Sequence, residues 1–185
     1  EAAISMETGL SVTVRMGQLE TIERTRDKSA GITVYQGQRR GHATTSDLSE
    51  GALKDTVRRA FEIARHTAED AFSGLPEEAE IARLHRDLEL FYPWNIDAQG
   101  ATSLALKAES AARGVSPAIR NSEGASVSAS HGQFHASNSR GFSGGYPYSR
   151  HWVSVAPIAQ QGDQMQRDDW YTTSRDPALL ADPAQ

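Results

Sequence analysis

The sequence predicts an α+β fold: a mostly antiparallel sheet built from hairpins, with two main helices packed on it. Three observations support this class. Apolar residues alternate with polar ones in the first 46 residues and again from Ile119 onward. Between these regions, two segments carry apolar residues at helical spacing. The order is therefore strands, helix, connection, helix, strands, which differs from the strand–helix alternation of a parallel sheet.

Two hairpins account for the first region. Apolar residues alternate up to Met16, so we expect the first bend at Gly17 and Gln18. The second hairpin repeats this scheme, with Gly37 in its turn and a return strand through His42 and Thr44. The apolar residues of the outgoing strands are Val12, Val14, Ile32 and Val34.

Two helices follow. The first is expected within residues 49–67, with Ser49 as its N-cap. One stripe of this helix should face a core, and it consists of Leu53, Val57, Ala60, Phe61 and Ala64. Residues 67–95 contain one glycine and two prolines and are expected to form a connection. The second helix is expected from about Asp97 to Arg113, where Gly114 supplies a stop signal.

From Ile119 onward the period returns to two. Ala125, Val127 and Ala129 are expected on one face and the intervening serines on the other. We place the next hairpin tip at Gly132 and Gln133, and we interpret the segment GFSGG as a turn or bulge. Residues 151–160 then form a strand, QGD a turn, and residues 164–173 the return strand.

The bulk composition excludes several classes of protein. The chain has 185 residues, a formal net charge of −5 and no basic stripe, which disfavours a nucleic-acid partner. It has no cysteine, which excludes disulfides, thiolate metal sites and a cysteine nucleophile within these residues and fits a reducing cytoplasm. No apolar run approaches the roughly 20 residues of a membrane-spanning helix, and we expect no signal peptide before the first strand.

The segment HGQFH (residues 131–135) has two histidines at the spacing of the zinc-protease motif H-E-x-x-H, with Gly132 at the position of the glutamate. That motif needs a helix, whereas the surrounding residues alternate like a strand. With the hairpin tip at Gly132, His131 and His135 would lie on opposite faces. We therefore expect no metal site here.

The remaining candidates for catalysis are weak. Ser149 and His151 are two apart on an expected strand, but no acid that would orient the histidine is evident, so a structural role is favoured. Asp168 and Asp169 are adjacent on a strand and point to opposite faces, which suits a carboxylate pair poorly. Two further histidines, His42 and His85, are expected at the surface. The residues themselves reveal no catalytic site.

Four blocks resemble a known family: GITVYQGQRRGHATTSDLS, IRNSEGASVSAS, SNSRGFSGGYPYSRHWVSV and GDQMQRDDWY. Together they are similar to the N-terminal half of the TldD/PmbA metallopeptidases, which are also labelled DNA gyrase modulators. They resemble the PmbA (TldE) branch more than the TldD branch. The likeness extends over most of the chain, so we expect residues 1–185 to be the N-terminal domain of a longer chain whose C-terminal domain lies outside this sequence.

The resemblance implies a function. Members of the family form a cytosolic TldD–PmbA heterodimer that cleaves peptides and unfolded proteins. Zinc is held by the TldD subunit through an H-E-x-x-x-H helix in its second half, whereas the PmbA subunit generally lacks these ligands. The resemblance thus implies a structural, substrate-enclosing segment with no catalytic motif, no cofactor of its own and no contact with nucleic acid or membrane. HGQFH has neither the spacing nor the glutamate of the family motif, so no metal role carries over to its histidines.

An exposed strand edge would suit an extended peptide, because its unpaired N–H and C=O groups can pair with a peptide backbone. Candidate residues for substrate contact lie beside glycine-rich bends, and they are Asn121, Glu123, Arg140, Arg150 and His151. Two alternatives stay open. One is a non-enzymatic regulatory binding protein that acts on gyrase or on a toxin–antitoxin pair. The other is an active homodimeric metallopeptidase of the TldD type.

Overall fold

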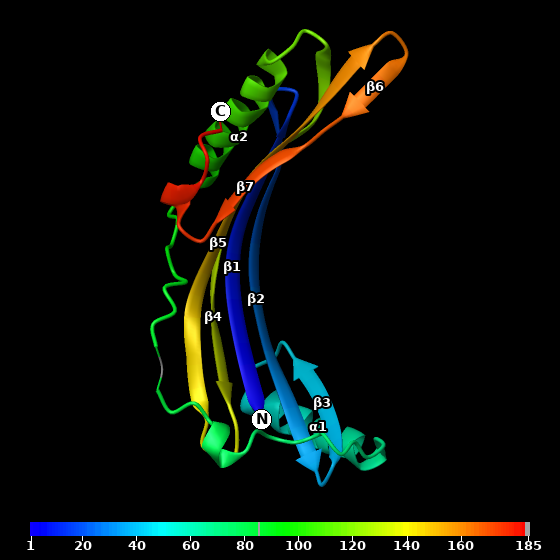
Figure 1. Cartoon of the computed structure of the whole chain (residues 1–185), viewed down its shortest axis with the longest axis vertical. Helices are drawn as coiled ribbons and strands as arrows, with labels where there is room; N and C mark the ends of the chain where they lie inside the picture. The colour runs from blue at the N-terminus through cyan, green and yellow to red at the C-terminus, as the bar shows by residue number, and fades with distance from the viewer. Residues whose placement is uncertain (85, 184–185) are drawn as a thin grey trace. The chain divides into compact units, whose positions relative to one another are not determined.

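A computed structural model describes residues 1–84 and 86–183, and it confirms the α+β class. Figure 1 shows how its strands and helices are arranged along the chain. Seven strands form one sheet in the order β3-β2-β1-β4-β5-β6, and β7 also pairs with β5. The strands are β1 (Ala2–Arg15), β2 (Gln18–Gln36), β3 (Arg39–Thr45), β4 (Ile119–Ser137), β5 (Ser143–Gln161), β6 (Gln164–Arg167) and β7 (Trp170–Ser174). The helices are α1 (Glu50–His66) and α2 (Ala98–Gly114), with short 3-10 turns at Glu78–Glu80 and Pro177–Leu179.

The chain divides into two compact units. Unit 1 contains Glu1–Glu7, Arg26–Glu89 and Gly132–Pro147. Unit 2 contains Thr8–Thr25, Leu90–His131 and Tyr148–Gln185, of which the last two residues are not described. The strands β1, β2, β4 and β5 contribute residues to both units.

Unit 1 is built on the antiparallel pair of β2 and β3. Ala30 pairs with Thr45 at one end of this hairpin and Gln36 with Arg39 at the other, next to the expected turn at Gly37. Helix α1 packs on β3 (Figure 1). Ser49 is its N-cap, as predicted, and its side chain accepts a hydrogen bond from the Ala52 N–H.

The buried face of α1 differs from the predicted stripe. It consists of Thr56, Ala60 and Ala64, while Val57 and Phe61 are 45% and 41% exposed. The reason lies at Gly41 of β3, where an added Cβ would collide with the main chain of α1 at Ala60 and Ala64. The helix approaches the strand so closely that only small side chains fit between them, and the larger ones turn outward.

Unit 2 holds the main core. The predicted inward residues of β1 and β4 are buried there together with the alanine face of α2. The cluster comprises Leu10, Val12, Val14, Ala101, Ala105, Ala108, Ala125, Val127 and Val153. Helix α2 begins one residue after its N-cap Asp97, whose carboxylate accepts the Gly100 N–H at 2.7 Å. The alternation therefore predicted the strand residues of this core correctly, whereas the expected apolar positions of the helix, Leu104, Leu106, Ala108, Ala111 and Ala112, share only Ala108 with its buried face.

Two hairpin tips differ from the predictions. The first turn lies at Met16 and Gly17, which have φ angles of 52° and 78°, one residue earlier than expected. The second lies beyond Ser137, so Gly132 is a buried residue within β4 and not a tip. The Asn138 carboxamide closes this turn by accepting the N–H groups of Arg140 and Phe142, and Gly141 has a φ of 92°.

Candidate functional site

An open strand edge is the first feature of interest. In the sheet order, β2 lies between β1 and β3, but β3 pairs only with residues from Ala30 onward. Within unit 2, residues 18–25 of β2 therefore have no partner strand on the side away from β1 among the described residues. All of these residues are exposed. The segment thus offers a row of backbone N–H and C=O groups at the edge of the sheet.

Two of the predicted contact residues, both on β4, are already engaged. The Asn121 carboxamide oxygen accepts the Ser122 N–H at 2.8 Å. Glu123 forms a salt bridge with Arg167 at 2.6 Å, and this contact raises the pKa of the arginine. Glu123 is thus engaged by Arg167 at the surface of unit 2, and the same guanidinium also contacts Asp169 at 3.1 Å.

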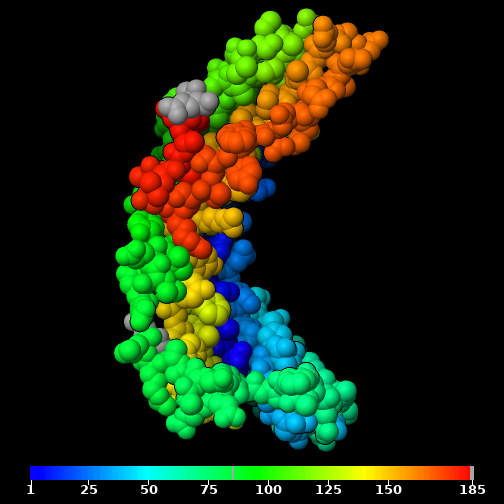
Figure 2. All heavy atoms as spheres, viewed as in Figure 1, coloured from blue at the N-terminus to red at the C-terminus, as the bar shows by residue number. Residues whose placement is uncertain are grey.

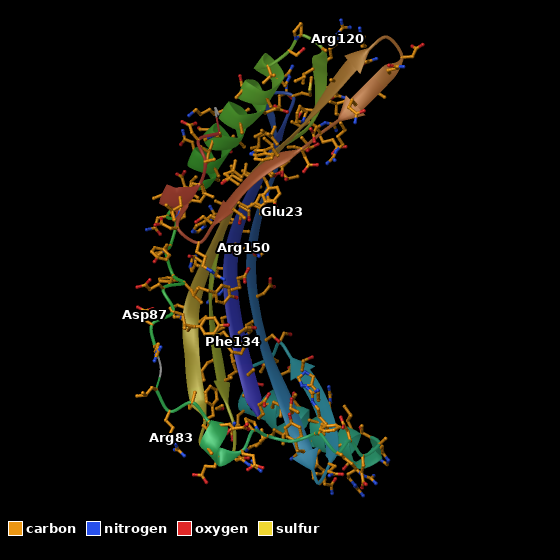
Figure 3. The ribbon with its side chains drawn as sticks, in the orientation of Figure 1. Glu23, Arg83, Asp87, Arg120, Phe134 and Arg150 are labelled. Carbon is orange, nitrogen blue, oxygen red and sulfur yellow. The ribbon has the colours of Figure 1, made fainter. Side chains whose placement is uncertain are left out.

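The two predicted arginines differ in their surroundings. Arg140, in unit 1, donates to the carbonyl oxygens of Leu75 and Pro76 at 3.3 and 2.8 Å, which ties the 67–97 connection to the β4–β5 turn. Arg150 lies on β5 in unit 2 and is exposed (Figure 3). Its guanidinium forms no hydrogen bond or ion pair within the described chain. Among the five candidates, Arg150 is the one whose charged group is available for a ligand.

His151 is only 1% exposed. Its Nε2 donates to the Tyr92 carbonyl oxygen at 2.8 Å, and its ring meets the Trp94 ring edge to face at 5.4 Å. Its Nδ1 is buried and has no partner among the described atoms. These contacts give His151 a structural role, and substrate contact by this residue stays a prediction.

Ser149, two residues earlier, is fully buried. Its hydroxyl accepts the Tyr92 N–H and donates to the Arg175 carbonyl oxygen, both at 2.9 Å. No hydrogen bond joins it to His151 in the described chain. The pair therefore holds residues 90–94 and Arg175 against β5, in agreement with the structural role favoured by the sequence.

The prediction that the two histidines of HGQFH lie on opposite faces is wrong. Because β4 continues through residues 131–135, their four-residue separation gives them the same side-chain direction, not opposite ones. His131 is bonded to the Thr8 hydroxyl at 3.2 Å and His135 to the Ser143 hydroxyl at 3.1 Å. No group of three side chains able to hold a metal is present among the described residues. His42 is exposed as expected, and His85 lies outside the described residues.

Glu109 is the important residue that sequence reasoning missed. It is 1% exposed on α2, and its carboxylate accepts the N–H groups of Met16 and Gly17 at 2.8 and 2.7 Å. Burial acts to raise the pKa of Glu109. The two N–H groups outweigh it, together with smaller contributions from Ser122 and Arg113, and the pKa lies below its ordinary value. A signal was present, because Glu109 is a charged residue within the alanine stripe of this helix.

Comparison with known proteins identifies the family. The model of the PmbA/TldA metallopeptidase domain 1 matches residues 1–64, and that of the central domain matches residues 91–184, more than half of the chain. The chain belongs to the PmbA/TldD metallopeptidase family. The resemblance inferred from the sequence is thereby confirmed.

Named relatives agree with this assignment. The chain is 40% identical over 183 residues to the metalloprotease PmbA homolog of Haemophilus influenzae. It is 38% identical to the metalloprotease PmbA of Escherichia coli O157:H7. Each alignment covers 99% of this chain and 41% of the relative, so the chain spans less than half the length of these proteins.

Solved structures of other proteins share the fold. A proposed modulator of DNA gyrase from Bacteroides thetaiotaomicron superposes with a TM-score of 0.87 at 16% identity, over 98% of this chain and 42% of that one. TldE from Thermococcus kodakarensis gives a TM-score of 0.78 at 15% identity, over 97% and 40% of the two chains.

None of the helices in the described residues has the length and apolar character needed to cross a membrane.

Proposed function

We propose that this chain is part of a PmbA/TldE-type subunit in a cytoplasmic TldD–PmbA zinc peptidase complex, which cleaves peptides and unfolded proteins. The segment has a structural, substrate-enclosing role and is itself non-catalytic. The named PmbA relatives support the branch. We further propose that zinc belongs to a TldD-like partner in a heterodimer, that a homodimer is the alternative assembly, and that nucleic acid and membranes are not partners.

The observation that carries this role, beyond family membership, is the open edge of β2 at residues 18–25. An extended peptide placed against this edge would add a strand to the sheet. Backbone hydrogen bonds would supply the affinity without demanding a particular peptide sequence. Such a mode suits a subunit that admits unfolded polypeptides of varied sequence. Arg150, also in unit 2, is a candidate for an additional contact with the peptide.

The test uses the protein that contains residues 1–185, purified with and without a TldD-like partner, and an unfolded polypeptide substrate. We expect cleavage by the pair, loss of cleavage with a zinc chelator, and none by this subunit alone. Substrate peptides N-methylated at single successive positions should lose cleavage at alternate positions, because only every second N–H of an added strand pairs with the edge.

Three outcomes contradict parts of the proposal. If the subunit and its TldD-like partner together show no metal-dependent cleavage, the peptidase function is contradicted and the regulatory binding protein is favoured. Metal-dependent cleavage by this subunit alone would favour the active homodimer. Equal cleavage of all N-methylated peptides would remove strand addition while leaving the peptidase function in place.

A further inference from the structure

A cavity in unit 2 lies apart from the open β2 edge. It has a volume of about 460 Å³, within the range of pockets that hold small ligands. Its floor comes from small apolar residues of α2 and β5, such as Ala111 and Val155, and its walls from β7 and residues 181–183. Figure 2 shows the red segment after β7 lying against the orange strand, where the Ala181 N–H donates to the Thr172 hydroxyl at 3.1 Å.

The rim of this cavity carries an aromatic residue that the fold leaves uncovered. Trp170 is 76% exposed and lines the opening beside Tyr171, whose ring stacks on Trp152 at 4.2 Å. A tryptophan with so much exposed surface is unusual, since tryptophan is highly buried on average. Tryptophan faces attract cations, and tryptophan is enriched among residues that dominate binding energies.

The charges around the cavity all have one sign. Three carboxylates line it, and no lysine, arginine or histidine does. Asp182 is paired with Lys107 at 2.7 Å, and Asp169 with Arg167 at 3.1 Å. Asp168 has no cationic partner among the described residues, and its carboxylate accepts only the Asp169 N–H at 2.9 Å. The cavity thus combines an apolar floor, an exposed aromatic face and a carboxylate, that of Asp168, with no cationic partner among the described residues.

We propose that this cavity binds an arginine side chain of an extended polypeptide. The aliphatic stem of the arginine would lie on the apolar floor, and its guanidinium would stack on Trp170 and pair with Asp168. Arginine suits both contacts, because its planar group stacks on aromatic rings and binds carboxylates through two hydrogen bonds. The choice of a peptide rests on the proposed function. Binding requires neither zinc nor cleavage, so the two proposals can fail separately.

The test is a titration of the 185-residue chain, labelled with ¹⁵N, with an acetylated and amidated Gly-Leu-Arg-Leu-Gly peptide. The three tryptophans give three indole N–H signals, which Trp170→Phe assigns in part. We expect the Trp170 signal to move and those of Trp94 and Trp152 to stay. A control peptide with citrulline in place of arginine keeps the shape and removes the charge. It should bind at least about tenfold more weakly.

Variants locate the charge. Asp168→Asn should abolish the preference for arginine over citrulline, whereas Asp163→Asn, an exposed aspartate in the β5–β6 turn, should retain it. Unmoved Trp94 and Trp152 signals in each variant show that the fold is intact. Equal binding of the two peptides, or an unchanged preference in Asp168→Asn, overturns the proposal. A Trp170 signal that follows protein concentration rather than peptide also overturns it, because the cavity would then bind a second copy of the chain.

Discussion

The carboxylate of Glu109 on α2 accepts the backbone N–H of Met16, a residue with a left-handed φ of 52°, at 2.8 Å. A positive φ is unfavourable for a side chain such as methionine. The same carboxylate accepts the N–H of Gly17, so one buried group fixes both residues of the β1–β2 turn. A helix far along the sequence therefore contacts both residues of the first hairpin bend.

The first prediction concerns this contact. Glu109→Gln keeps the size of the side chain but replaces one acceptor with an NH₂ group that faces a backbone donor. We expect a loss of about 1–3 kcal/mol in the free energy of unfolding, because one of the two backbone N–H groups loses its acceptor on the buried side chain. Urea unfolding of the chain measures it. Glu62→Gln, an exposed residue of α1, is the control and should change stability by less than about 0.5 kcal/mol. Equal effects of both changes would contradict the assigned role.

The second prediction is a pH dependence. The folded-state pKa of Glu109 is lowered from its ordinary value of 4.5. A lowered folded pKa means that the carboxylate contributes stability that is fully present above the unfolded-state pKa and is lost as the pH falls through the folded value. The stability difference between wild type and Glu109→Gln should therefore be constant above about pH 5.5, roughly one unit above that pKa, and shrink below pH 4.5. Urea unfolding midpoints of wild type and Glu109→Gln, measured from pH 7 to pH 3, test this prediction. A stability difference that grows as the pH falls would contradict it.

The third prediction concerns the contact of α1 with β3. Gly41→Ala should destabilise unit 1 by about 1–3 kcal/mol, because the new methyl group meets the main chain of α1 and the helix must shift. Gly51→Ala is the matched control within α1, where no atom lies within 4 Å of the added Cβ. It should be neutral or stabilising by about 0.4–1 kcal/mol. Unfolding measured by circular dichroism compares the two variants. A Gly41→Ala variant as stable as wild type would contradict the close contact between α1 and β3 at this glycine.

The sequence predicted well those features that depend on neighbouring residues. The alternation of Val12 and Val14, and that of Ala125 and Val127, placed the core faces of β1 and β4 correctly. Ser49 and Asp97 marked the two helix starts. These signals are local, since strand pleat and N-cap geometry involve residues a few positions apart.

The features that were missed depend on contacts between distant segments. Phe61 has the spacing of a core residue, but α1 turns Ala60 and Ala64 toward Gly41, and Phe61 is 41% exposed. Gly132 resembles a turn residue, but β4 continues through it because Asn138 supplies a better turn six residues later. For the candidate site, the sequence named Arg150, whose guanidinium proves available, together with residues that are engaged elsewhere. No local pattern distinguished Arg150 from Arg140.

The last prediction separates these two arginines. Arg150 has an exposed guanidinium without a described partner, whereas Arg140 holds the carbonyl groups of Leu75 and Pro76. In the assembled complex with a TldD-like partner, Arg150→Ala should lower kcat/KM for peptide cleavage about tenfold, because a charged hydrogen bond to the peptide is lost. It should leave the melting temperature of the chain unchanged. Arg140→Ala should instead lower the melting temperature, since the 67–97 connection loses its attachment to the β4–β5 turn. Unchanged cleavage by Arg150→Ala in an intact complex would remove this residue from the substrate-contact site. Arg150→Lys keeps the positive charge and should retain part of the activity that Arg150→Ala loses.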